Sequence, residues 1–99
     1  MNLPFEMRQT YLDRRFEELS VLKKNINNPD FSLLKKWGHQ IKGNAKSFDF
    51  DELTKIAIQF EKIAESKKIE DLLSAITSFE QCLTLCAQRL SLEKPITNK

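Results

Sequence analysis

The chain has 99 residues, which is enough for one small domain and too short for two. Hydrophobic residues make up 40% and charged residues 30%, a balance that excludes a disordered chain. The formal net charge of +2 is too small to indicate nucleic-acid binding by itself. We therefore expect a single domain over residues 1–99.

The chain contains only two Gly and three Pro, and its long stretch without either favours helices over a turn-rich β fold. No apolar run reaches the length of a membrane span, and residues 1–10 lack the apolar core of a signal peptide. We expect a cytoplasmic protein that does not contact a membrane.

The first helix is predicted over about residues 4–26, and a break near its start would leave a short extra N-terminal helix. The Asn-Asn-Pro run at 27–29 ends it, and Asp30 can cap the next helix, predicted over about 31–47. Both segments carry apolar stripes at steps of three or four residues. The stripes comprise Leu12, Phe16, Leu19, Leu22 and Ile26, then Leu34, Trp37, Ile41, Ala45 and Phe48.

A third helix is predicted over about residues 51–66, with Asp49 and Asp51 placed to satisfy the free N–H groups at its start. A fourth is predicted over about 69–92, after the cations Lys67 and Lys68. Their apolar stripes must face those of the first two helices, and the connections are short. The sequence therefore predicts an all-α, antiparallel, up-down-up-down four-helix bundle.

His39 is the only histidine and lies within the second predicted helix. At about 100° per residue, it points roughly 160° or more away from Ile41 and Phe48 on the apolar side. It is therefore predicted to face solvent. Lys42 lies one turn away on one flank, and Gly43, which costs a helix about 0.5–1 kcal/mol relative to Ala, leaves a bare backbone on the other.

These three residues suit the transfer of a phosphoryl group. The ordinary pKa of an imidazole is about 6.5, so the neutral ring is a nucleophile near pH 7 without a general base. A cation such as Lys42 can stabilise the charge on the phosphoryl oxygens. A glycine such as Gly43 would let another protein approach closely.

The segment WGHQIKGNA, from Trp37 to Ala45, resembles the motif of histidine-containing phosphotransfer (HPt) domains. That motif has a small residue, His, any residue, Leu or Ile, Lys, Gly and then two small residues. The resemblance continues through the apolar positions 48 and 53, the helix start at 30–31 and residues 11–14. It covers about residues 11–90, which we expect to form the core of the domain.

The resemblance implies that His39 accepts a phosphoryl group at Nε2 from a receiver-domain aspartate and passes it to another aspartate. The partners would be a response regulator, a hybrid histidine kinase or both. Lys42 would stabilise the phosphoryl group and Gly43 would clear space for the receiver. Mg²⁺ would belong to the partner, so this chain would be a phosphocarrier without a cofactor, a metal or catalysis of its own. We expect a monomer.

The sequence departs from the motif at three positions. Asn44 and Lys46 stand where small residues are usual, and Asp49 stands where the family typically has Gly. Aspartate tolerates the left-handed backbone conformation better than most residues, so the loop is expected to survive. Lys35, Lys36, Lys42 and Lys46 make this face of the second helix basic, which predicts attraction to an acidic pocket on a partner protein. The candidate partner-binding residues are Lys35, Lys36, Asn44 and Lys46.

The alternative function is a four-helix module that binds a receiver or another signalling protein without carrying phosphate. An independent enzyme is disfavoured because the only His stands on a convex helix face, and no phosphate-binding Gly-rich loop is present. A nucleic-acid role is disfavoured because Trp37 faces the core and cannot stack on bases.

Cys82 and Cys86 lie four residues apart on one predicted helix. Residues on the same helical turn rarely have disulfide geometry, which favours two free thiols. A metal pair is the other interpretation, but no second His/Cys pair lies nearby to complete a tetrahedral site.

Overall fold

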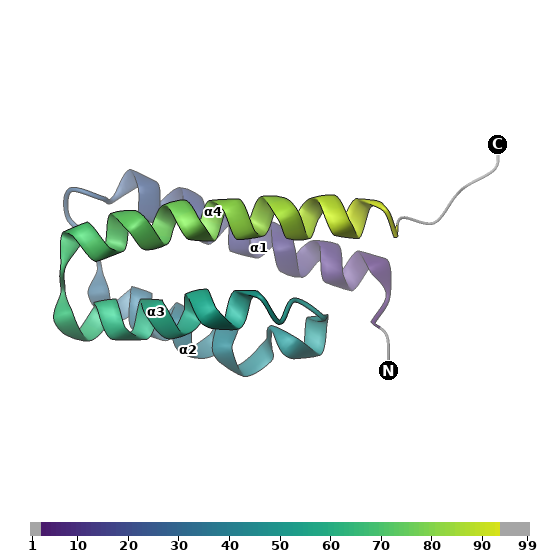
Figure 1. Cartoon of the computed structure of the whole chain (residues 1–99), viewed down its shortest axis with the longest axis horizontal. Helices are drawn as coiled ribbons and strands as arrows, with labels where there is room; N and C mark the ends of the chain where they lie inside the picture. Colours follow the sequence, from purple (N-terminus) through teal and green to yellow (C-terminus); the bar gives the residue numbers. More distant parts are fainter. Residues whose placement is uncertain (1–2, 94–99) are drawn as a thin grey trace.

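The computed structural model describes residues 3–93, which form four α-helices. They are α1 (Phe5–Lys24), α2 (Phe31–Asn44), α3 (Leu53–Ser66) and α4 (Ile69–Ser91), and a short 3₁₀ helix, η1 (Lys46–Phe48), follows α2. Consecutive helices run in opposite directions (Figure 1). The predicted all-α, up-down-up-down bundle is confirmed. None of the helices within residues 3–93 is long and apolar enough to cross a membrane.

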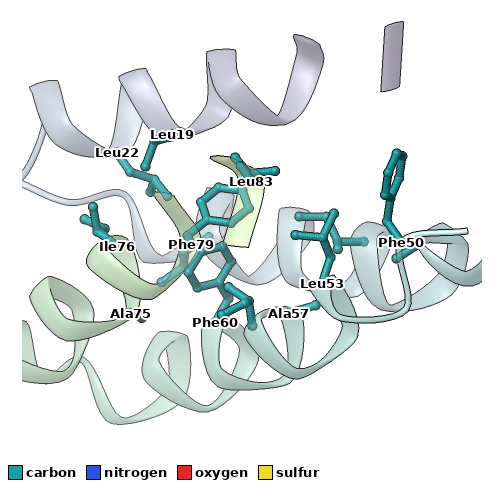
Figure 2. Packing of buried hydrophobic residues seen from close by; sticks show 14 of the residues in the cluster. Leu19, Leu22, Phe50, Leu53, Ala57, Phe60, Ala75, Ile76, Phe79 and Leu83 are labelled. Carbon is teal, nitrogen blue, oxygen red and sulfur yellow. The ribbon is translucent and has the colours of Figure 1, made fainter. Parts of the chain in front are cut away.

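The closely packed pairs are α2 with α3, α1 with α4, and α3 with α4. In Figure 1, α1 and α4 lie along one side of the bundle and α2 and α3 along the other. The core lies between them, where the rings of Phe60 and Phe79 meet edge to face at 5.1 Å (Figure 2). Because α1 and α2 are not a closely packed pair, the surface between them is open for a site.

The helix starts follow the sequence only in part. The side chain of Asp30 accepts a hydrogen bond from the backbone N–H of Leu33 at 3.0 Å, which confirms its predicted capping role. α1 begins at Phe5 without a break, so within residues 3–93 no separate short helix precedes it. The predicted acidic cap of α3 is wrong, because no side chain caps this helix and backbone carbonyls of Phe50 and Asp51 accept hydrogen bonds there instead.

The end of α2 differs from the predicted helix over 31–47. The α-helix ends at Asn44 and the chain tightens into η1, which takes Lys46 off α2. Asp49 then turns the chain with φ 65° and ψ 36°. This is the left-handed conformation that an aspartate was expected to tolerate at this position. The turn carries the chain back into the start of α3.

Candidate functional site

The imidazole of His39 lies on the outer surface of α2, with 78% of its side chain exposed. Ile41, two residues further along the helix, is buried in the core. The helical periodicity that separates these two residues therefore confirms the predicted exposure of His39.

Glu61 on α3 lies beside two of the predicted site residues. One carboxylate oxygen is 2.8 Å from Nζ of Lys42, and the other is 3.6 Å from Nδ1 of His39. The hydrogen bond from Lys42, aided by the charges of Lys42 and His39, holds the pKa of Glu61 below its usual range, and desolvation opposes this shift. Glu61 is therefore ionised at neutral pH, with one negative charge facing Nδ1.

Gly38 explains why α3 comes so close to the histidine. A Cβ at this position would lie 2.8 Å from the backbone carbonyl oxygen of Ala57 and 3.1 Å from Cβ of Phe60 and Cγ of Glu61. Those distances leave no space for a side chain. The bare backbone of Gly38 thus lets α2 and α3 approach and brings Glu61 within reach of His39.

On the other flank of His39, a hollow of about 520 Å³ lies between α1 and α2. We call it the α1–α2 hollow. Its lining residues are Tyr11, Arg14 and Arg15 from α1, His39, Gln40, Gly43 and Asn44 from α2, and Phe48 from η1. A Cβ added to Gly43 would meet no atom within 4 Å. Gly43 therefore serves no packing contact inside the described chain, and its backbone is open to an approaching molecule.

Tyr11 fixes the wall of the α1–α2 hollow. Its hydroxyl donates a hydrogen bond of 2.6 Å to Oδ1 of Asn44. Its ring stacks on that of Phe48 at 4.2 Å and packs near that of Phe50 at 6.0 Å. Burial raises the pKa of the Tyr11 hydroxyl, so this donor stays protonated at neutral pH. The hollow is thus held by contacts between α1, the end of α2 and η1.

A family model described as the Hpt domain matches residues 6–91. The chain belongs to the Hpt domain family. Hpt domains act in histidine phosphotransfer within phosphorelays, where they interact with receiver domains and kinases, and they are phosphocarriers rather than catalysts. No curated protein and no solved structure shows a significant match to this chain.

The structure separates the remaining candidate residues of this Hpt domain. Lys35 and Lys36 are exposed on α2, and Lys35 lines a different hollow with residues 28–32. Lys46, the first residue of η1, lines a third hollow with Arg8 and Asp49 and does not line the α1–α2 hollow. Its place on the face of His39, two turns further along the chain, stays a prediction. Asn44 lies at the α1–α2 hollow, although its amide oxygen is engaged by Tyr11.

Sequence reasoning missed Glu61 and Arg14 as site residues. Both depend on which helix faces pack together, which a single helix wheel does not report. The small pair Gly38 and Ala57 was a usable signal, because two small residues on neighbouring helices permit a close approach. That approach would have placed Glu61, one turn after Ala57, beside α2.

The two cysteines of this Hpt domain are free thiols, as predicted. Cys86 is buried and Cys82 is half-buried on α4. The hydrogen bond between them, with burial, raises the pKa of Cys86, while the same hydrogen bond lowers that of Cys82. The metal interpretation gains no support within residues 3–93, where no three His, Cys, Asp or Glu side chains cluster.

Proposed function

We propose that this Hpt domain relays a phosphoryl group between receiver-domain aspartates through His39. The observation that carries the proposal is the exposed imidazole with Nδ1 facing the ionised Glu61 carboxylate at 3.6 Å. A carboxylate at this position favours the tautomer with its proton on Nδ1, although 3.6 Å is longer than a hydrogen bond. The lone pair then lies on Nε2, on the side of the ring away from Glu61.

The transfer needs few groups from this chain. The Nε2 lone pair attacks the phosphorus of an aspartyl phosphate, and an Nε2–P bond forms. The bond between phosphorus and the aspartate oxygen breaks, and its electron pair returns to the carboxylate. Glu61 stabilises the positive charge that spreads over the ring, while Lys42, one turn along α2 from His39, is paired with Glu61. The reverse reaction delivers the group to a second aspartate, and Mg²⁺ belongs to the receiver.

The surface next to His39 suits a protein donor. An apolar hollow of about 340 Å³ adjoins the α1–α2 hollow and shares Tyr11, Arg14 and Phe48 with it. Met7, half-exposed, lines its far side. Together the two hollows provide a contact area beside the nucleophile, apolar in the smaller hollow and mixed in the α1–α2 hollow, where Gly43 leaves the backbone uncovered.

The test is to mix the protein with a receiver domain that carries labelled phosphate on its aspartate, in the presence of Mg²⁺. We expect acid-labile label on the wild-type chain and none on His39→Gln. The exposed position of His39 predicts that the variant keeps its fold, which circular dichroism checks. Label retained by folded His39→Gln would contradict the proposal. Receiver binding without any label on the wild type would favour the non-phosphorylated interaction module instead.

A further inference from the structure

The cations around His39 differ in whether an acid already neutralises them. Lys42 lies 2.8 Å from Glu61, so the pair has little net charge. Arg15 is buried on α1, where its guanidinium packs over the Tyr11 ring and lies 2.7 Å from the Glu18 carboxylate. Neither side chain has an unbalanced charge to offer to an anion held on the imidazole.

Arg14 is different. It is exposed on α1, lines the α1–α2 hollow together with His39, and makes no hydrogen bond or ion pair within residues 3–93. Glu18, one turn further along α1, is already engaged by Arg15. The guanidinium of Arg14, whose charge acts on the Glu18 carboxylate without forming an ion pair, is therefore free of a bound acid at the edge of the hollow that the histidine borders.

The register of the two helices places Arg14 close to the level of the histidine. Tyr11 and Asn44 are joined at 2.6 Å across the antiparallel pair α1 and α2. Three residues forward from Tyr11 and three back from Asn44 bring Arg14 level with Ile41. At 1.5 Å per residue, this lies about 3 Å along the axis from His39. The offset along the axis is thus small, and both side chains line the same hollow.

The orientation of the His39 ring also favours the α1–α2 hollow as the place of the phosphoryl group. Nδ1 faces Glu61 on α3, so Nε2 lies on the opposite edge of the ring, away from that carboxylate. A phosphoryl group on Nε2 carries negative charge and is repelled by Glu61, whereas the α1–α2 hollow offers Arg14 and the amide of Gln40. A guanidinium can donate two parallel hydrogen bonds to phosphoryl oxygens.

We propose that Arg14 binds the phosphoryl group carried on Nε2 of His39, across the hollow between α1 and α2. This rests on the proposed phosphotransfer function and names a phosphoryl-binding residue for it. Arg14 acts as the donor releases the group, because charge on the transferring oxygens then moves into the hollow. Loss of one charge-assisted contact of this kind is expected to slow the transfer about tenfold.

The test compares two donors of different size. One is a phosphorylated receiver domain with Mg²⁺, and the other is phosphoramidate, which is too small to need a docking surface. With phosphoramidate, Nε2 attacks phosphorus, the reagent's P–N bond breaks and ammonia leaves. Initial rates of phosphohistidine formation are measured for the wild type, Arg14→Gln, Arg14→Lys and the matched control Lys24→Gln, which removes an exposed cation from the far end of α1.

We expect Arg14→Gln to react about tenfold more slowly with both donors, Arg14→Lys to recover part of the rate, and Lys24→Gln to match the wild type. All four proteins should unfold at nearly the same temperature, since Arg14 makes no hydrogen bond or ion pair within residues 3–93 and Lys24 is exposed. An Arg14→Gln rate with phosphoramidate equal to the wild type would overturn the proposal, and slowing confined to the receiver would assign Arg14 to docking alone. A wild type that takes no label from the receiver contradicts the phosphotransfer function itself.

Discussion

The carboxylate of Glu61 on α3 lies 2.8 Å from Nζ of Lys42 on α2. The same carboxylate is 3.6 Å from Nδ1 of His39, so a single acid contacts both the nucleophile and its neighbouring cation. Lys42 lowers the pKa of Glu61, and the ionised Glu61 in turn favours a proton on Nδ1 of the ring. The charge state of this acid therefore links the two helices that form the site.

Removing the ammonium of Lys42 is expected to raise the pKa of Glu61 toward its ordinary value, because the hydrogen bond from Lys42 is the largest cause of its depression. The Glu61–Lys42 contact stabilises the fold fully above the ordinary glutamate pKa, and this contribution is lost as the pH falls through the lower folded value. NMR titration of the Glu61 carboxyl carbon in Lys42→Met measures the change. Lys62→Met is the control, and an unchanged Glu61 titration in Lys42→Met would refute the assignment.

Replacement of Gly43 by Ala is expected to change the stability of the fold and the rate of phosphoryl transfer in opposite directions. An added Cβ meets nothing within 4 Å, so Gly43→Ala should stabilise the helix by about 0.5–1 kcal/mol. The same methyl group stands in the α1–α2 hollow and should slow transfer from a receiver about tenfold by displacing the donor. Denaturant unfolding and transfer kinetics provide the two measurements. A variant that is both more stable and equally fast would show that Gly43 gives no clearance to a partner.

Gly38→Ala should have the opposite effect on stability. Its Cβ would lie 2.8 Å from the Ala57 carbonyl oxygen, so α2 and α3 must move apart. We expect a loss of about 1–3 kcal/mol from overpacking, partly offset by the roughly 1 kcal/mol that Ala gains over Gly in a helix. The NMR titration of Glu61 should also shift, because the acid moves away from Lys42. A midpoint of denaturant unfolding for Gly38→Ala equal to that of the wild type would contradict the claim that Gly38 permits the close approach of α2 and α3.

The fold and the exposure of His39 could be predicted because both follow from local periodicity. The stripes of α1 to α4 and the outward direction of His39 need only the 3.6-residue repeat. The left-handed turn at Asp49 could also be anticipated, because the HPt motif typically has Gly at this position and aspartate is one of the few other residues that tolerate the left-handed conformation.

What the sequence could not provide depends on contacts between helices. Glu61 becomes a site residue only because Gly38 lets α3 approach α2 within the reach of its side chain. The predicted end of the second helix at residue 47 was wrong because the backbone tightens into η1 after Asn44, which a regular helix wheel does not report. The expected acidic cap on α3 failed because backbone carbonyls already bond the first N–H groups.

The central claim is that His39 carries the phosphoryl group on Nε2 while Glu61 faces Nδ1. The most direct measurement is NMR of the ¹⁵N-labelled protein after phosphorylation by a receiver, in which coupling to ³¹P identifies the nitrogen bonded to phosphorus. The structure predicts phosphorus on Nε2 of His39 and a proton retained on Nδ1. Phosphorus on Nδ1, or on any other residue, would contradict the account.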